Sequence, residues 1–189
     1  MNRRDMLKMI VTATGTAFIG AKVFAYELTS ATPVAKTGFT VNDIALMNEI
    51  GEVIIPKTDT PGAKAADVGS IMAVMVADCF TADEQETFTT GLVKLQTSAK
   101  DAYNSDFMLL SNDKKMALLT SLDKEALSYN AKRESKEDMP HYFSIIKQQV
   151  LFGFFTSKIG ATKVLRYVAI PGSYDGYYPY KEGDKAWAT

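Results

Sequence analysis

Cysteine and histidine are almost missing from this chain of 189 residues, which has one of each, Cys79 and His141. A Cys/His zinc cluster, a thiolate-bound iron–sulfur cluster, covalent haem attachment through C-x-x-C-H and an internal disulfide all need more of these residues, so the sequence excludes them. It also has no glycine-rich dinucleotide fingerprint and no P-loop. We therefore expect no cofactor and no metal in this chain.

Clustered positive charge is also missing. The 21 Lys and Arg residues are balanced by 22 Asp and Glu residues, and no basic patch indicates a nucleic-acid partner. Hydrophobic residues make up 47% of the chain, which is enough for a sizeable core. The length suits one compact domain and a leader.

The N-terminus has the features of an export leader. Arg3 and Arg4 are followed by an apolar pair that ends in Leu7 and then by Lys8, which resembles a twin-arginine signal. The apolar run after Lys8 is shorter than the roughly 20 residues of a spanning helix, and Ala25 completes a small-residue cleavage site. We predict a cleaved twin-arginine signal and a periplasmic mature protein. A basic N-terminal helix, an uncleaved anchor and the general export route are the alternatives.

The export route bears on function. The twin-arginine pathway moves folded proteins, and folding before export is needed chiefly when a cofactor is inserted in the cytoplasm. Because no cofactor site is found in this chain, the leader would serve a partner that holds a cofactor and lacks a leader of its own.

Start and stop signals divide the rest of the chain. We predict a signal peptide over residues 1–25, a linker or arm over 26–39, a helical domain over 40–167 and an extended tail over 168–189. Within the domain, Thr40, Thr81 and Ser111 are expected to cap helices, and Pro140 to open the last long one. The expected helices cover residues 40–55, 68–80, 81–103, the stretch from 111 to the charge run at 132–138, and 140–155, with one or two further turns over 161–167 after a break at Gly160.

Apolar residues at helical spacing predict the buried faces of these helices. They are Ile44, Met47, Ile50 and Ile54 in the first, Phe88, Leu92, Leu95 and Ala99 in the third, and Met116, Leu119, Leu122 and Ala126 in the fourth. Phe107 and Leu110 are expected to pack inward. We find no convincing strand pair. The predicted fold is therefore all-α, an irregular or orthogonal helical bundle with an extended, aromatic-rich C-terminal arm.

Four features keep two interpretations each. Cys79 is either a buried inert thiol or one half of a disulfide to another subunit. His141 is either a capping or surface histidine or a general base, although no partner group or pocket is indicated for it. The aromatic run at residues 152–155 and the tyrosine-rich tail belong either to the protein's own core or to a partner interface.

One loop stands out between two apolar helices. It contains Pro56, Thr58, Asp59, Thr60, Pro61, Gly62 and Ala63. Pro56 stops the preceding helix, Pro61-Gly62 forms a turn, and the side-chain oxygens between them can accept from free backbone donors. An ordinary interhelical turn would explain these residues.

The amino-acid sequence of this loop, together with a C-terminal block and the leader, resembles the gluconate 2-dehydrogenase subunit 3 family. The C-terminal block contains Phe155, Thr156, Ser157, Gly160, Tyr167, Pro171, Gly172, Tyr174, Gly176 and Trp187. The resemblance marks these residues and the loop as family motif and candidate partner interface. Some relatives have a cysteine where this chain has Tyr177, which puts a covalent tie between subunits at that point in doubt.

The resemblance implies a non-catalytic small subunit. Its partner would be a large FAD-containing flavoprotein of the glucose–methanol–choline type that oxidises a sugar or sugar acid. A multihaem c-type cytochrome commonly passes the electrons to membrane quinone, so membrane association would be indirect. The small subunit would support maturation and export of the flavoprotein. An independent exported binding or structural protein is the main alternative. A free-standing enzyme, with Asp59 and His141 as acid–base candidates, is the other.

Overall fold

The computed structural model describes residues 36–135, 138–170, 172–173 and 175–188. Residues 39–189 form one compact unit. The export-signal residues Arg3, Arg4, Leu7, Lys8 and Ala25 lie outside the described residues, as do Pro171 and Tyr174 of the C-terminal motif and most of the predicted linker.

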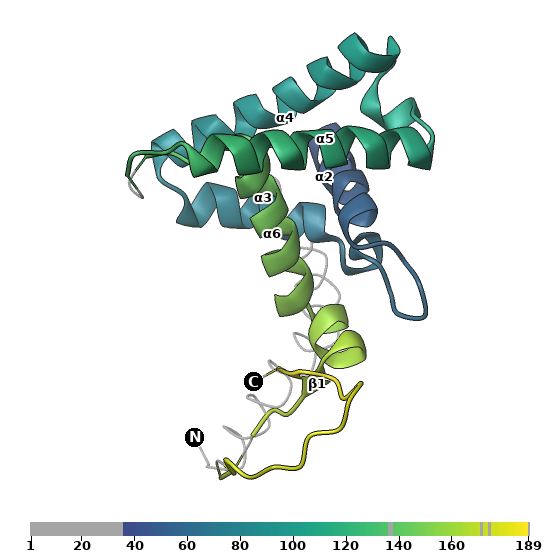
Figure 1. Ribbon diagram of the computed structural model, residues 1–189, viewed down its shortest axis with the longest axis vertical. Helices are drawn as coiled ribbons and strands as arrows, with labels where there is room; N and C mark the ends of the chain where they lie inside the picture. Colours follow the sequence, from purple (N-terminus) through teal and green to yellow (C-terminus); the bar gives the residue numbers. More distant parts are fainter. Residues whose placement is uncertain (1–35, 136–137, 171, 174, 189) are drawn as a thin grey trace, which may run out of the picture. The chain divides into compact units, whose positions relative to one another are not determined.

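The prediction of an all-α fold is confirmed (Figure 1). The α-helices are α2 (Val41–Ile54), α3 (Val68–Cys79), α4 (Ala82–Tyr103), α5 (Asn112–Ala131) and α6 (Tyr142–Thr156). Shorter turns are η1 (Ala63–Ala66), η2 (Phe107–Leu109) and η3 (Gly160–Val164), the last with π-type hydrogen bonding. Two-residue strands, β1 (Arg166–Tyr167) and β2 (Trp187–Ala188), follow.

Two predicted caps have the full reciprocal geometry. The Thr40 side chain accepts from the Asp43 amide while the Asp43 carboxylate accepts from the Thr40 amide. Thr81 and Glu84 repeat this arrangement at the start of α4. These hydrogen bonds from Thr81 hold the pKa of the Glu84 carboxyl below its ordinary value. Ser111 occupies the cap position of α5 without a side-chain hydrogen bond to the helix.

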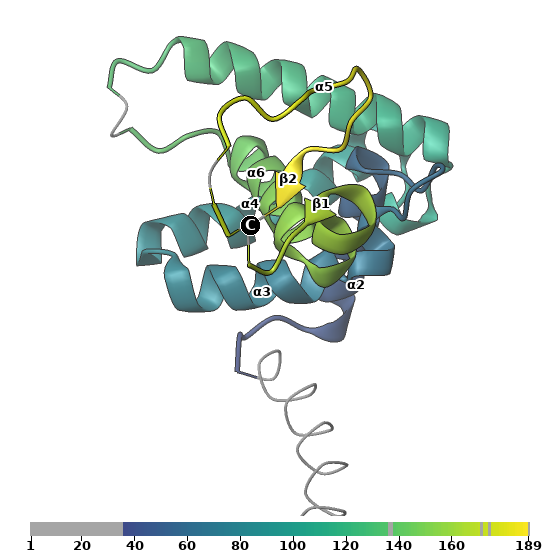
Figure 2. The same ribbon diagram turned by 90° about the horizontal axis from the view of Figure 1, so that it is seen from below.

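Helix α6 is the central element of the bundle, because it contacts α2, α3, α4 and α5 (Figures 1 and 2). It buries Phe143, Ile146 and Val150 along one face. Its second half is only partly covered, so that Phe154 is buried while Phe152 and Phe155 are exposed. The aromatic run therefore divides between core and surface.

The predicted buried face of α5 is confirmed at Leu119, Leu122 and Ala126 and is wrong at Met116. Met116 is 48% exposed, whereas Lys115 and Leu118 are buried beside Leu119, Leu122 and Ala126. The physical reason is a buried ion pair, because the Lys115 ammonium lies 2.7 Å from a carboxylate oxygen of Glu49 on α2. A lysine can point inward where such a partner is present, and apolar periodicity gives no sign of it.

Smaller corrections concern residues near helix ends. Ile44 and Ile54 are only half-buried, and Leu46 joins Met47 and Ile50 in the core. The interpretation of Cys79 as a buried thiol was wrong, because it is the last residue of α3 and lies exposed beyond Val76, the last buried residue of that helix.

The C-terminal segment also differs from its prediction. Helix α6 begins at Tyr142 with His141 as its cap, so Pro140 precedes the helix. Ser157, not Gly160, ends α6. A strand pair was not expected, yet β1 and β2 pair in parallel with Arg166 opposite Trp187 and Tyr167 opposite Ala188. Each strand has only two residues, and the two strands are about 20 residues apart in the chain. A strand pair of this kind leaves no alternation of polar and apolar residues by which the sequence could predict it.

Close backbone approach between α2 and α3 depends on glycine. A Cβ at Gly69 would lie 2.4 Å from the Ile44 carbonyl oxygen, and one at Gly51 would lie 2.6 Å from Val68 Cγ2. Real Cβ atoms do not approach a carbonyl oxygen this closely, so the two helices can cross at this distance only with Gly69 in place.

We predict that Gly69→Ala lowers the free energy of unfolding by about 1–3 kcal/mol, because the new methyl group must push α3 away from α2. Gly153→Ala in α6 is the matched control, since the nearest atom to its Cβ is Ile71 Cγ2 at 3.4 Å, an ordinary contact. Urea denaturation of the two variants checks the difference. Equal stability of the two variants would contradict the tight crossing.

Candidate functional site

The motif loop between α2 and η1 is shaped by one carboxylate. The two Glu52 oxygens accept from the Lys57 amide at 3.0 Å and from the Lys64 amide at 2.8 Å. The loop is closed further by the Ala63 amide, which donates to the Ile55 carbonyl at 2.9 Å. Glu52 therefore fixes both ends of the loop to the last turn of α2.

This arrangement explains two of the motif residues. A Cβ at Gly62 would lie 2.5 Å from one Glu52 oxygen and 2.6 Å from the Lys57 nitrogen, so only glycine fits there. Ala63 is fully buried. Pro56, Thr58 and Asp59 are exposed, and Thr60 and Pro61 are half-buried. The exposed part of the loop is thus short and is held by buried neighbours.

Two further polar residues of α2 fix the segments that pack beside the loop. Glu49 pairs with Lys115 and Lys64. Burial raises the pKa of its carboxyl, but the hydrogen bonds and charges of the two lysines outweigh burial and leave the pKa below its ordinary value. The Asn48 side chain accepts from the Gly69 amide at 2.8 Å and donates to Asp67 at 2.7 Å.

The first part of the C-terminal motif has a similar structural role. The Ser157 hydroxyl donates to the Phe154 carbonyl at 2.6 Å and accepts from the Gly160 amide at 3.0 Å. A Cβ at Gly160 would lie 1.9 Å from the Phe154 oxygen. Ser157 and Gly160 therefore turn the chain out of α6 into η3. Phe155 and Thr156 are exposed on the last turn of α6.

The later motif residues lie on the surface of the arm. Tyr167, Gly172, Gly176 and Trp187 are all exposed. Gly172 has a φ of +76°, a conformation that favours glycine. These motif residues and those of the loop come from separate elements, and within the described part of the chain no hydrogen bond or ion pair joins the two groups.

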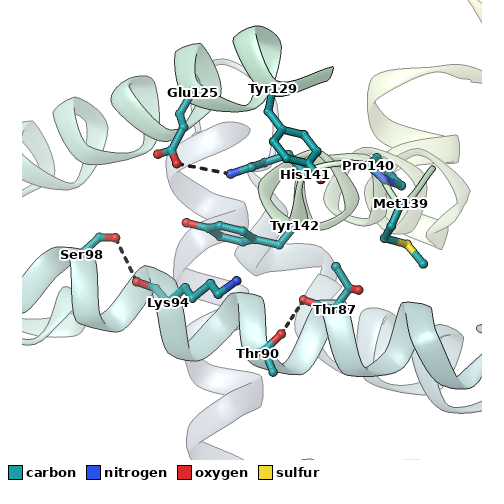
Figure 3. Close-up of a pocket in the computed structure, with 10 residues that line it drawn as sticks. All are labelled: Thr87, Thr90, Lys94, Ser98, Glu125, Tyr129, Met139, Pro140, His141 and Tyr142. Atoms are coloured by element: carbon teal, nitrogen blue, oxygen red, sulfur yellow. Dashed lines mark hydrogen bonds and ion pairs between the residues drawn. The ribbon is translucent and has the colours of Figure 1, made fainter. Parts of the chain in front are cut away.

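A separate pocket of about 600 Å³ lies between α4, α5 and the start of α6 (Figure 3). Tyr142 lies across its middle, with Lys94 of α4 on one side and His141 on the other, while Glu125 and Tyr129 come from α5. Burial raises the pKa of the Tyr142 hydroxyl. The Tyr142 ring rests on Gly91, where a Cβ would lie 2.8 Å from it.

His141 is confirmed as a helix cap. Its Nδ1 accepts from the Phe143 amide at 3.3 Å, and its Nε2 lies 3.7 Å from a Glu125 oxygen. In a neutral ring with an accepting Nδ1, the hydrogen is on Nε2, so no lone pair is left for a general base. Asp59 lies on the loop after α2, so the structure does not bring the two acid–base candidates together.

Among the described residues, no group of His, Cys, Asp and Glu side chains is arranged to hold a metal ion. Within the same part of the chain, no helix is long and apolar enough to cross a membrane. The motif residues themselves fall into two groups. Some, such as Gly62 and Ser157, determine the path of the backbone, and the others have exposed side chains.

Fold and site together define a small all-α protein whose motif residues shape one loop and one C-terminal arm. The family model for gluconate 2-dehydrogenase subunit 3 matches residues 42–172. This is more than half of the chain, so the chain belongs to that family, as the sequence motifs predicted. Neither the curated proteins nor the solved structures with which the chain was compared gave a match.

Sequence reasoning missed Asn48, Glu49, Glu52 and Arg166. The first three had a signal, because they are polar residues on one side of an otherwise apolar helix that leads into a proline loop. Arg166 had none, since its contacts lie in the tail, far along the chain.

We predict that Glu52→Gln loosens the loop, because an amide nitrogen would replace one of the two accepting oxygens and leave a backbone N–H unpaired. Both amides are exposed, so water can replace the lost bond, and the expected cost is about 0.5–1.5 kcal/mol. Hydrogen exchange at residues 55–64 should rise. Glu86→Gln, an exposed change on α4, is the control. Unchanged exchange in Glu52→Gln would rule out the carboxylate as the organiser of the loop.

We also predict an acid-sensitive stability from His141. Burial lowers its pKa from the ordinary 6.5, although Glu125 opposes this shift and Lys94 adds to it. Its contribution to stability is therefore complete above pH 6.5 and is lost as the pH falls through the lower, folded-state pKa.

The expected loss between pH 7.5 and 5.5 is about 1 kcal/mol or less, measured as the free energy of unfolding in urea. Because the chain has one histidine, His141→Asn, which keeps a good capping residue, should remove the dependence in this range. A pH dependence that persists in His141→Asn would assign it to other groups.

Proposed function

We propose that this chain is the non-catalytic small subunit of an exported FAD-dependent dehydrogenase that oxidises a sugar or sugar acid, such as gluconate. Its role is to support assembly and twin-arginine export of the flavoprotein subunit. The observation that carries this proposal is the family match over residues 42–172, which includes the whole motif loop and most of the C-terminal block.

The character of the candidate site supports this role. Its buried members determine the path of the backbone; they are Gly62, Ala63, Ser157 and Gly160. Its exposed members include Phe155, Tyr167 and Trp187, and aromatic side chains are enriched at protein interfaces. His141, the residue that a catalytic role would most need, uses its Nδ1 to cap α6.

In this proposal the redox chemistry belongs to the partners. FAD is bound by the large subunit of glucose–methanol–choline type, and c-type haem by a cytochrome subunit that passes electrons to membrane quinone. The chain itself is periplasmic and reaches the membrane through these partners. Substrate specificity then resides in the flavoprotein.

The test is a pull-down from cells of the chain tagged after Thr189, with its native leader or with Arg3→Lys/Arg4→Lys. Lys22→Arg, a conservative change outside the arginine pair, is the control. We expect a flavoprotein, identified by mass spectrometry and flavin absorbance, to co-purify from the periplasm. The double substitution should leave both proteins in the cytoplasm, whereas Lys22→Arg should not.

Recovery of the chain alone and without flavin, with flavoprotein export unchanged by the double substitution, would overturn the proposal. An independent exported binding or structural protein would then be the better description.

A further inference from the structure

In its described residues the C-terminal arm from Tyr167 to Trp187 has no helix, and its end pairs with its own start. The Arg166 amide donates to the Ala186 carbonyl at 2.8 Å, and the Val168 amide donates to the Ala188 carbonyl at 3.2 Å. The Lys185 ammonium also donates to the Lys163 carbonyl at the end of η3. A structureless loop of this length is uncommon in a compact domain unless it has a function.

One side chain contacts three separate points of this arm. The Arg166 guanidinium lies 4.5 Å from the centre of the Trp187 ring and 5.8 Å from that of Tyr178. It also donates to the Tyr178 hydroxyl at 3.3 Å and lies 3.6 Å from an Asp184 oxygen. The two rings meet edge to face at 5.4 Å. Stacking and forked donation at once suit a planar guanidinium and not an ammonium.

Asp184 extends this cluster into the turn before β2. Its carboxylate accepts from the Lys181 amide at 3.0 Å, and its own amide donates to the Lys181 carbonyl at 3.0 Å. Gly183, in the same turn, has a φ of +87°. Arg166 therefore acts on the backbone of the arm through a residue that is itself fixed in a turn.

Other large side chains of the arm are exposed, and one of them, Tyr180, also lines the pocket around Arg166. Ile170 is 85%, Tyr177 97% and Tyr180 78% exposed. Tyrosine at such positions gives contact area at low conformational-entropy cost and is frequent among residues that dominate binding energy. The contacts of Arg166 thus hold the arm in one conformation, and the exposed side chains lie on the surface of the arm.

We propose that Arg166 is the positioning residue of a preformed docking arm, and that the arm presents Tyr177 and Tyr180 to the flavoprotein subunit. This inference rests on the proposed function for the identity of the occupant. A preformed arm loses less conformational entropy on binding than one that orders on contact, so its affinity depends on Arg166 even if the partner never touches that residue.

Trp187 is the only tryptophan of the chain, so its fluorescence reports on the contact between Arg166 and Trp187 in the isolated protein. Arg166→Met removes the guanidinium from one face of a ring that is already 48% exposed. We expect acrylamide quenching to rise about twofold with a red shift of the emission, while far-UV circular dichroism stays unchanged. Arg166→Lys, which keeps the charge for Asp184, should restore only part of the protection. Lys158→Met, a change at an exposed cation upstream, is the control.

The same variants are then compared for retention of the flavoprotein in the complex pulled down from cells. Arg166→Met should speed its loss about tenfold, in line with the loss of about 1.4 kcal/mol. Tyr177→Ser/Tyr180→Ser should weaken retention, and Tyr177→Ser alone should leave Trp187 fluorescence unchanged, because Tyr177 is 97% exposed and does not line the pocket around Arg166.

The outcomes separate the two proposals. Unchanged Trp187 quenching in Arg166→Met overturns the positioning role, whatever the partner. Normal retention by Tyr177→Ser/Tyr180→Ser overturns the docking surface. Absence of any flavoprotein from the wild-type complex overturns the proposed function, while the fluorescence result still decides whether Arg166 orders the arm.

Discussion

The polar face of α2 is the constraint on which the loop and the start of α3 depend. Asn48, Glu49 and Glu52 stand on one side of a helix whose other side is in the core. A polar side chain taken out of water needs hydrogen-bonding or charged partners, and these three residues find them on the segments that surround α2. Glu52 binds the loop, Asn48 binds the amide of Gly69 at the start of α3, and Glu49 binds Lys115 of α5. The course of the chain from α2 to α3 is therefore specified by hydrogen bonds that only one geometry satisfies.

The family motif has a clear physical meaning once this geometry is known. Gly62 and Gly160 occupy positions where a Cβ would overlap an oxygen atom, and Ser157 joins a carbonyl and an amide across the end of α6. These residues specify the path of the backbone. Buried motif residues cannot contact a partner directly, so only the exposed ones, such as Thr58 and Tyr167, are available for recognition. The family motif thus contains residues of two kinds, those that shape the backbone and those whose side chains are exposed.

Local rules predicted the helices well because helix caps and apolar periodicity act within a few residues. The caps at Thr40 and Thr81 and the buried face of α4 are confirmed. The prediction failed where a distant partner decides the outcome. Lys115 is buried because Glu49, far along the chain, neutralises it. The β1–β2 bridge and the contacts of Arg166 join positions that share no periodic pattern. For the candidate site, the motif residues could be named from sequence, but the division into structural and exposed members needed coordinates.

The order of the C-terminal arm depends on a single side chain, Arg166, which lies outside the helical core. Ordering one residue of irregular chain costs about 1–2 kcal/mol in conformational entropy, and the arm buries little apolar surface to offset this cost. Its order must then come from a few strong contacts, and the Arg166 cluster supplies stacking, hydrogen bonding and charge at one point. If the chain accompanies a folded partner through export, the surface that recognises this partner must already be shaped in the cytoplasm. The contacts of Arg166 meet this requirement, because they lie within the arm and need neither the partner nor a cofactor to form.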